Sequence, residues 1–305
     1  MTTDPAAWRG SDLTTDRSWV VELSDAHRRE LLAAATSGEL PSLEPELRDW
    51  RRRLQHGYGI LLVRGVPVED LGEQQARDVF ALLGRHLGDP VSQNKDGELI
   101  TDIRDVGNDP SDPEVRLYTT AAEQDFHTDG ADLIGLLCLR SAREGGLNRV
   151  VSSVTVYDEV ARRRPDLAAL LLQDWHFFLH TQPDGTPLTF AMPIVRQDGD
   201  RIVTFFIPWY IRRAQGLPGV PDLTPEQDEA LRLYEETANR PDLYLDMDFR
   251  PGDMQWIRNA VVLHKRTAYV DWPEPERRRH LLRLWLTARE FADGDDLLRA
   301  GIPQA

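Results

Sequence analysis

Apolar residues in the first ninety positions recur at three- and four-residue spacing, which is the period of an amphipathic helix. This spacing predicts helices over residues 25–38, 44–57 and 73–88. Ser24 is placed to cap the first helix and Gly38 to end it. Between the second and third helices, the apolar run "YGILLVRG" at 58–65 predicts a buried strand.

From about residue 90 the pattern changes to short apolar or alternating runs, separated by clusters of Gly, Pro and Asp, which is typical of strands. The stretch "VRQDGDRIV" at 195–203 predicts a hairpin. Helical insertions are predicted near 155–172 and 224–239, and Thr224 with Gln227 forms a capping-box sequence at the start of the second. The predicted strands are 98–103, 116–120, 132–139, 149–153, 175–180, 188–195, 201–207, 243–249, 254–259 and 280–288.

These elements predict a mainly β fold with flanking helices, in which a β-sandwich or jelly-roll core is wrapped by helices. No Pro-, Gly- or Ser-rich linker divides the chain, so residues 1–305 are expected to form a single domain. Residues 1–90 are predicted to be a helical front end that packs on a core of residues 91–290.

Composition narrows the range of partners. The chain has 36 Lys and Arg against 51 Asp and Glu, which gives a net charge of −15. This acidic balance argues against binding to nucleic acid or to an anionic membrane, because both need a basic surface. A hydrophobic content of 41% is enough for a sizeable core.

The N-terminal stretch "MTTDPAAWRGSD" has neither the basic nor the apolar segment of a secretory signal. No apolar run approaches the ~20 residues of a membrane helix. The single cysteine, Cys138, lies in "LIGLLCL", where a buried, small apolar role is expected. A soluble, cytoplasmic protein is therefore expected, and a homo-oligomer stays open.

The first candidate metal-binding motif is "FHTDG" at 126–130, in which His127 and Asp129 stand two residues apart. If the pair lies at a strand end, both side chains point to one face and can reach one metal ion. Alone the motif is weak, because 8 His and 51 acidic residues would produce roughly one such pair by chance. The candidates for a third ligand are the other histidines, His27, His56, His86, His176, His180, His264 and His280.

A second candidate lies near the end of the chain, in "RRRHLLRLWL". If this run is a strand, Arg279, Arg283 and Trp285 share one face, whereas His280 and the leucines at 282, 284 and 286 share the other. The leucine face is a core face, and we expect the arginine face to be enclosed as well. A buried arginine is costly without an anion, so this pattern predicts an anion-binding site.

The chain resembles the taurine dioxygenase (TauD/TfdA) family from about residue 58 to 290. The likeness is carried by "FHTDG", by "EGG" at 144–146, by "GDMQWIRNAVVLH" and by "RRRHLLRLWL". The resemblance implies a double-stranded β-helix (jelly-roll) core. It also implies that His127, Asp129 and His264 bind Fe(II) as the two-histidine, one-carboxylate set of non-haem oxygenases.

The same resemblance implies roles for two arginines and an asparagine. Arg279, fifteen residues after His264, is expected to bind the distal carboxylate of 2-oxoglutarate. Arg283 is expected to bind an anionic group of the substrate. Asn148 stands where the family often has a Thr or Ser that contacts the co-substrate, with Ser152 or Ser153 as a substitute.

The implied activity is an Fe(II)/2-oxoglutarate-dependent dioxygenase. It would use O₂ to hydroxylate an unactivated C–H bond of a small molecule, while 2-oxoglutarate becomes succinate and CO₂. The substrate is expected to carry a carboxylate or other anionic group. Two alternatives stay open: a jelly-roll metallohydrolase at the same ligands, and a non-catalytic metal- or ligand-binding relative.

The substrate pocket is predicted less directly. The polar segment 92–125 precedes the metal motif, and loops in such a place often line or cover a pocket. Within it, Gln93, Tyr118 and Glu123 are candidate substrate-binding residues. Trp209 and Tyr210 are candidates for the pocket mouth or, alternatively, for aromatic core.

Overall fold

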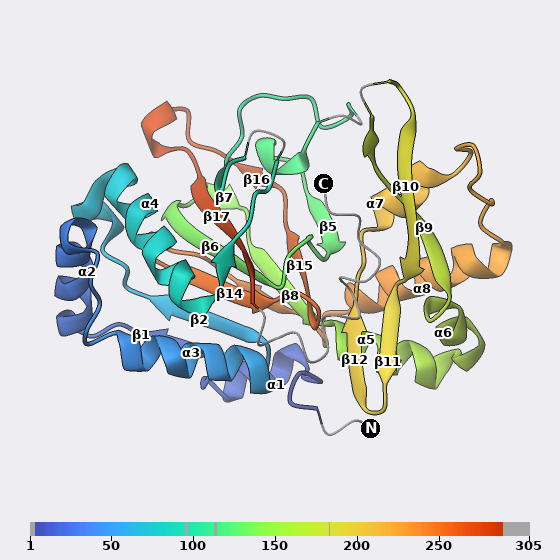
Figure 1. Cartoon of the computed structure of the whole chain (residues 1–305), viewed down its shortest axis with the longest axis horizontal. Coiled ribbons are helices and arrows are strands. Elements are labelled where there is room, and N and C mark those ends of the chain that lie inside the picture. The colour runs from blue at the N-terminus through green and yellow to red at the C-terminus, as the bar shows by residue number, and fades with distance from the viewer. Residues whose placement is uncertain (1–3, 95–96, 113–114, 183, 289–305) are drawn as a thin grey trace.

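A computed structural model describes residues 4–94, 97–112, 115–182 and 184–288 (Figure 1). Within these residues the largest element is a seven-stranded sheet, the large sheet, with the order β1-β2-β14-β6-β17-β3 and with β4 paired to β17. The pair β1 and β2 is parallel, and the other pairs are antiparallel. Its strands are β1 (Val20–Glu22), β2 (Ile60–Arg64), β3 (Asp89–Pro90), β4 (Ile100–Ile103), β6 (Leu133–Arg140), β14 (Met254–Arg258) and β17 (His280–Thr287).

A second, four-stranded antiparallel sheet, the small sheet, has the order β13-β8-β15-β5. Its strands are β5 (Gln124–His127), β8 (Asn148–Ser152), β13 (Leu245–Met247) and β15 (Val262–Arg266). Val150 and Val262 of the small sheet lie in the same hydrophobic cluster as Ile134, Ile257 and Leu281 of the large sheet. The two sheets therefore share one apolar core.

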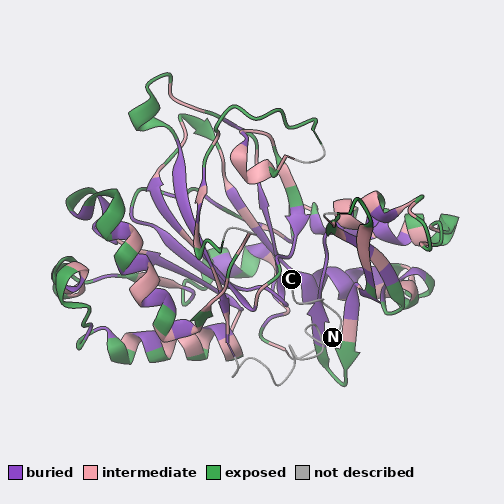
Figure 2. Cartoon of the chain, turned by 45° about the horizontal axis from the view of Figure 1, so that its top comes forward, coloured by how far each residue is buried: buried purple, intermediate pink, exposed green. Residues whose placement is uncertain are grey.

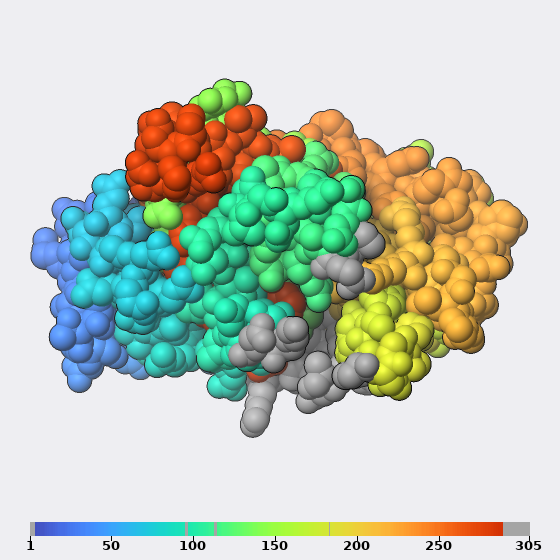
Figure 3. Space-filling view, turned by 90° about the horizontal axis from the view of Figure 1, so that it is seen from above, coloured from blue at the N-terminus to red at the C-terminus, as the bar shows by residue number. Residues whose placement is uncertain are grey.

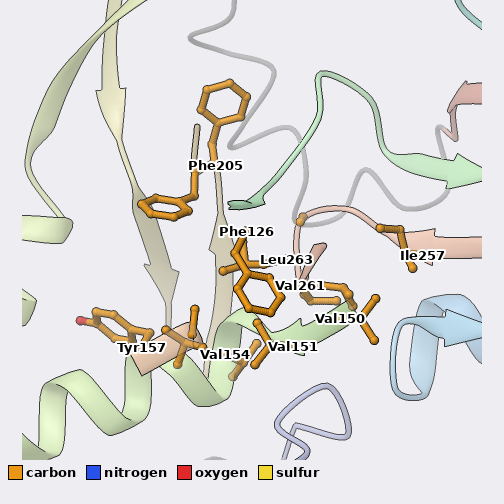
Figure 4. Close-up of a cluster of buried hydrophobic side chains, with 14 of the residues drawn as sticks. Phe126, Val150, Val151, Val154, Tyr157, Phe205, Ile257, Val261 and Leu263 are labelled. Atoms are coloured by element: carbon orange, nitrogen blue, oxygen red, sulfur yellow. The ribbon is translucent and has the colours of Figure 1, made fainter. Parts of the chain in front are cut away.

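Helices cover the other face of each sheet. On the large sheet, α2 (Asp25–Ser37), α3 (Glu44–His56) and α4 (Val68–Leu87) pack on a second cluster that includes Trp256, Leu282 and Leu284. On the small sheet, alternation turns Val151 and Leu263 away from the large sheet, and Figure 4 shows them near α5 (Ser153–Arg163). Figure 2 shows the same arrangement by burial, with exposed residues on the outer sides of the helices and buried ones toward the sheets.

The remaining elements form a lobe beside the small sheet (Figure 1). It contains two hairpins and three more helices. These are β9 (Asp174–Thr181) with β10 (Pro187–Pro193), β11 (Val195–Asp198) with β12 (Arg201–Thr204), α6 (Pro165–Leu171), α7 (Pro208–Ala214) and α8 (Pro225–Ala238). Elsewhere the chain forms α1 (Gly10–Thr15), the short pair β7 (Glu144–Gly145) and β16 (Tyr269–Val270), and the 3₁₀ helices η1 (Leu117–Thr119) and η2 (Pro275–Arg277).

One glycine shows how tightly the large sheet is packed. Gly135 in β6 lies under the Trp256 ring of the neighbouring strand, and a Cβ at this position would stand 2.3 Å from that ring. Trp256 is fully buried and also contacts Phe80 of α4, with the ring centroids 5.4 Å apart. The missing side chain of Gly135 therefore makes the room in which the indole joins the sheet to the front-end helices.

The mainly β fold with flanking helices is confirmed, as are the three front-end helices. Ser24 caps α2 and Gly38 ends it in a left-handed conformation with φ 71°. The capping box of Thr224 and Gln227 is also present. The front end does more than pack on the core, since β1, β2 and β3 belong to the large sheet itself.

Some local predictions were wrong. Residues 116–120 were predicted as a strand but contain η1, because the Thr119 and Thr120 hydroxyls donate to the carbonyls of Arg116 and Leu117 and close a turn. The helices α1 and α7 were missed because each is only six or seven residues long. The insertion near 155–172 is two helices, α5 and α6, which break at Pro165.

Candidate functional site

His127, Asp129 and His264 come together between the two sheets. His127 is the last residue of β5, Asp129 follows it by two, and His264 lies opposite His127 on the neighbouring β15. The three ligand atoms lie within 4.8 Å of one another, and all three residues are buried. Asp129 Oδ1 is 3.8 Å from His127 Nε2, and its Oδ2 is 3.5 Å from His264 Nε2. The predicted convergence of the three residues is confirmed.

Protonation suits this donor set to a divalent metal. The Nδ1–H of His127 donates to the Asp125 carbonyl at 2.8 Å, so Nε2 carries the lone pair, which accepts from the Gln124 side-chain amide at 3.1 Å and lies 3.8 Å from Asp129 Oδ1. Burial, reinforced by nearby His264, lowers the pKa of His127 to about 3, so the imidazole is neutral. Burial alone would raise the pKa of Asp129, but the Arg283 guanidinium and the His264 imidazole hold it well below its ordinary value. A neutral imidazole and an ionised carboxylate are the forms that ligate metals.

Two residues that the sequence did not single out hold Asp129 in place. The Asn259 side chain accepts from the Asp129 backbone N–H at 2.8 Å and donates to the Asp129 carbonyl at 2.7 Å. The Trp285 indole N–H donates to Asp129 Oδ2 at 3.1 Å. A signal for both existed, because Asn259 lies in "GDMQWIRNAVVLH" and Trp285 lies on the predicted arginine face of β17.

A cavity of about 40 Å³ lies beside the three residues, and both histidines line it. Asn148 and Tyr118 are also in its wall, together with Arg279 and Arg283. Asn148 is buried, and its amide donates to Gln255 Oε1. Ser152 instead caps α5 by accepting from the Thr155 backbone N–H, so it does not replace Asn148 in the cavity.

Arg279 is enclosed, as strand alternation predicted. It is 4% exposed, and burial lowers its pKa. Its Nη1 has no hydrogen-bond partner among the described residues, and its guanidinium lies 5.0 Å from the centre of the Tyr269 ring. Gly146, with φ +69°, passes so close that a Cβ there would lie 3.1 Å from Arg279 Nε. The "EGG" motif thus gives Arg279 its space.

A further buried arginine is Arg266, which the sequence offers, together with Arg258, as the next candidate for 2-oxoglutarate if Arg279 does not bind it. It lines the same cavity, and desolvation, followed by repulsion from Arg279, lowers its pKa to about 10. Its Nε and Nη1 also lack hydrogen-bond partners within the described ranges. Arg266 follows His264 by two residues, so its position on the same face of β15 was readable from alternation.

Arg283 lies near both the candidate metal ligands and two predicted pocket residues. Its Nη1 is 3.6 Å from Asp129 Oδ2, and its guanidinium lies 5.1 Å from the Tyr118 ring and 4.9 Å from the Trp285 ring. Gln93 accepts from Arg283 Nε at 2.7 Å and donates to the Arg283 carbonyl at 2.9 Å. Gln93 is not in the cavity wall, so it is placed to support Arg283 rather than to touch a ligand in the cavity.

Glu123 itself is not in the cavity wall. Its side chain is about half exposed and pairs at 2.5 Å with Nζ of Lys265, which does line the cavity. The neighbouring Gln124 points into the cavity instead, because the pairing of β5 with β15 is irregular between His264 and Arg266 and sets Gln124, three residues before His127, opposite Arg266. Trp209 and Tyr210 were the candidates for the pocket mouth or the aromatic core. The Trp209 ring lies 4.9 Å from the His127 ring, and the Tyr210 hydroxyl accepts from Arg116 at 2.7 Å.

Figure 3 shows the segment that follows β3, teal to green in colour, lying across the centre of the face seen from above. The part of this segment around Tyr118 belongs to the cavity wall, which agrees with the prediction that 92–125 covers a pocket. Among the described helices, none has the length and apolar character needed to cross a membrane.

A two-histidine, one-carboxylate set inside a two-sheet fold is typical of mononuclear non-haem iron oxygenases. The comparisons agree. Residues 25–285 match the model of the taurine catabolism dioxygenase TauD, TfdA family. The chain therefore belongs to this family, and it is an Fe(II)/2-oxoglutarate-dependent dioxygenase that uses O₂. The enzyme prediction is confirmed, and the metallohydrolase and the non-catalytic alternatives fall away.

Two curated relatives illustrate the likeness. FR-33289 synthase of Streptomyces rubellomurinus is 30% identical over 330 aligned positions, which cover 99% of this chain and 96% of the relative. A uridine-5'-phosphate dioxygenase from a Streptomyces species is 28% identical over 243 positions, covering 74% of this chain and 84% of the relative.

Solved structures share the fold at lower identity. An asparagine oxygenase in complex with Fe(II), 2S,3S-3-hydroxyasparagine and succinate superposes with a TM-score of 0.66 at 18% identity, covering 88% of this chain and 93% of the other. The non-haem iron oxygenase OrfP in complex with Fe and alpha-ketoglutaric acid gives a TM-score of 0.62 at 15% identity, with coverages of 88% and 94%.

Proposed function

We propose that this enzyme hydroxylates a C–H bond of a small anionic molecule at a centre where His127, Asp129 and His264 hold Fe(II). The observation that carries the proposal is the convergence of the three ligand atoms within 4.8 Å, in a buried place bordered by arginines. When bound, iron supplies the oxidising chemistry in which O₂ and 2-oxoglutarate are consumed and succinate and CO₂ are released.

We assign the two facing sheets to a double-stranded β-helix core. The pairing within the sheets, which is antiparallel except between β1 and β2, and the shared apolar cluster between them support this assignment. In this arrangement the metal ligands lie on the small sheet, whereas Arg279 and Arg283 lie on or next to β17 of the large sheet. A ligand between the sheets would touch both groups.

Arg279 is assigned to the distal carboxylate of 2-oxoglutarate. Its buried guanidinium has an Nη1 without a partner in the described part of the chain, and a guanidinium pairs with a carboxylate through two parallel hydrogen bonds. Asn148 is assigned to the co-substrate side of the cavity, because it lies in the cavity wall together with Arg279 and its side-chain amide could hydrogen-bond a carboxylate.

Arg283 is assigned to an anionic group of the substrate, with Tyr118 packed on its guanidinium and Gln93 fixing its position. Its 3.6 Å approach to Asp129 supports this assignment, because an anion held by Arg283 would lie near the metal ligands, where the reacting C–H bond must lie. A relative named for uridine-5'-phosphate acts on a molecule that carries a phosphate, which supports an anionic substrate here as well.

The metal assignment is tested by iron stoichiometry and by the visible charge-transfer band expected when Fe(II) and 2-oxoglutarate bind without O₂. Asp129→Ala and a His127→Ala/His264→Ala double variant should lose both signals. Asp125→Ala is the matched control, because that carboxylate is 67% exposed and lies two residues before His127. Stoichiometric iron in the double variant would overturn the assignment.

The substrate assignment is tested by screening small anionic and neutral molecules for stimulated succinate formation. Stimulation confined to molecules with a carboxylate, phosphate or similar group is the expected result. A neutral molecule that couples succinate formation to its own hydroxylation as well as any anion does would contradict the role of Arg283.

A further inference from the structure

The last residue of β15 is an arginine whose surroundings leave it without an anion. Arg266 is 6% exposed and lines the cavity together with His264. Its Nη2 donates to the carbonyls of Leu117 and Ala122, but its Nε and Nη1 have no hydrogen-bond partner within the described residues. A guanidinium buried with unpaired N–H groups is costly, so its retention calls for a ligand.

Arg266 shares this condition with Arg279. Their guanidinium groups lie 5.1 Å and 5.0 Å from the centre of the same ring, that of Tyr269. Neither forms an ion pair with any carboxylate of the described chain, since Asp271 accepts from the backbone N–H of Arg279 rather than from its guanidinium. Two like charges are thus held close together in a buried place, and each raises the cost of the other.

We propose that Arg266 is a second co-substrate-binding residue, so that the distal carboxylate of 2-oxoglutarate is held by a two-arginine site made of Arg266 and Arg279. The inference rests on the proposed role of Arg279 and extends it. A carboxylate has two oxygens with about four lone-pair positions. It can therefore accept from one of the two partnerless nitrogens of Arg266, Nε or Nη1, and from Nη1 of Arg279, which also lacks a partner within the described residues.

Such a site would allow a protein with a net charge of −15 to bind a dianionic co-substrate, because the local charge in the cavity is positive. Arg266 belongs to β15 of the small sheet and Arg279 lies next to β17 of the large sheet, so both sheets would contact the same carboxylate. A keto acid without the distal carboxylate would reach the metal ligands but would leave both guanidinium groups unpaired. Selectivity for the dicarboxylate is the measurable consequence.

The test compares 2-oxoglutarate with 2-oxovalerate, which has a methyl group in place of the distal carboxylate. Both are titrated without O₂ into Fe(II)-loaded protein, and Kd is read from the charge-transfer band. The ratio of the two Kd values is the readout, because a general disturbance of the fold weakens both ligands together. Arg266→Gln should reduce the preference for 2-oxoglutarate by about 10- to 100-fold, as expected for lost hydrogen bonds to a charged group.

Controls separate binding from structure. Arg266→Gln also removes the contacts to Leu117 and Ala122, so Arg266→Lys, which keeps the charge but lacks the planar fork, is measured as a second variant and should lower the preference by a smaller factor. Arg258→Gln is the matched control. Arg258 is also buried and donates to a backbone carbonyl, that of Gln55, but it lies outside the cavity wall, and its ratio should equal that of the wild type.

The outcomes are distinct. If Arg279→Gln lowers the preference and Arg266→Gln leaves it unchanged, the two-arginine site is wrong and Arg279 acts alone. If the wild-type protein does not prefer 2-oxoglutarate over 2-oxovalerate, the proposed role of Arg279 itself is wrong. A reduced preference in both variants, with the Arg258→Gln control unchanged, supports the two-arginine site.

Discussion

Replacing Arg283 with Gln separates substrate binding from structural support. The change removes a charge-assisted hydrogen bond, from Nε to Gln93 Oε1 at 2.7 Å, and the guanidinium 3.6 Å from Asp129. A hydrogen bond to a charged group contributes about 1.5–3 kcal/mol. We expect the iron-free variant to lose about 2–3 kcal/mol of unfolding free energy, and the iron-loaded variant to lose less, because the metal then offsets the charge of Asp129.

Arg283→Gln should weaken the binding of the substrate more than the binding of 2-oxoglutarate. Loss of about 2–3 kcal/mol at the substrate anion corresponds to roughly 30- to 150-fold weaker binding. The co-substrate should bind within about threefold of the wild type, since Arg279 is unchanged. The assay measures the Kd of 2-oxoglutarate by the anaerobic charge-transfer band and that of the substrate by isothermal titration calorimetry of the same iron-loaded protein.

Gln93→Leu is the matched variant, because it removes the partner of Arg283 and keeps the guanidinium. It should cost stability but leave most of the substrate affinity. The reasoning is refuted if Arg283→Gln and Gln93→Leu destabilise the protein equally while neither changes substrate binding by more than about threefold. Arg283 would then be a structural partner of Asp129 and Gln93.

Three further predictions concern the metal, the packing and pH. Adding Fe(II) should raise the Tm of the wild type but not of Asp129→Ala, as differential scanning fluorimetry would show. Gly135→Ala should lower the unfolding free energy in urea by about 1–3 kcal/mol or more, because its Cβ would stand 2.3 Å from the Trp256 ring; an unchanged midpoint would contradict this packing. The hydrogen bond from His280, together with Arg77, lowers the pKa of Asp102 to about 2. A lowered carboxyl pKa stabilises the fold above the unfolded value of about 3.9, so the stability difference from Asp102→Asn, about 1 kcal/mol after allowing for partial exposure, should shrink between pH 4 and 2. A difference that stays constant across this pH range would refute it.

Alternation on β17 was the strongest structural signal in the sequence. Leu282, Leu284 and Leu286 pack under the front-end helices, whereas Arg279 and Arg283 face the small sheet, as the period of two predicts. The Cys138 prediction is also confirmed: the thiol is buried, and burial raises its pKa to about 12. Such features can be predicted from the sequence because residues two positions apart on a strand lie on the same face.

The contacts that tune the site were not readable in this way. Gln93 touches Arg283 across 190 positions of sequence, and Trp285 reaches Asp129 across 156. Neither contact has a local signature, because both depend on which strands become neighbours in the large sheet and in what register. Glu123 and Gln124 show the same limit, because the irregular pairing of β5 with β15 that turns Gln124 toward the cavity has no signature in the sequence.

The site therefore combines residues from short sequence motifs with residues that come from separate segments of the chain. The residues proposed to bind iron and 2-oxoglutarate lie in short motifs on or next to β5, β8, β15 and β17. The groups around Arg283 come from three separate segments: Gln93 after β3, Tyr118 in η1 and Asp129 after β5. A substitution in one of those segments can move the Arg283 guanidinium without touching the metal ligands. Substrate selectivity should accordingly change more readily than the oxidation chemistry, because the two depend on different parts of the chain.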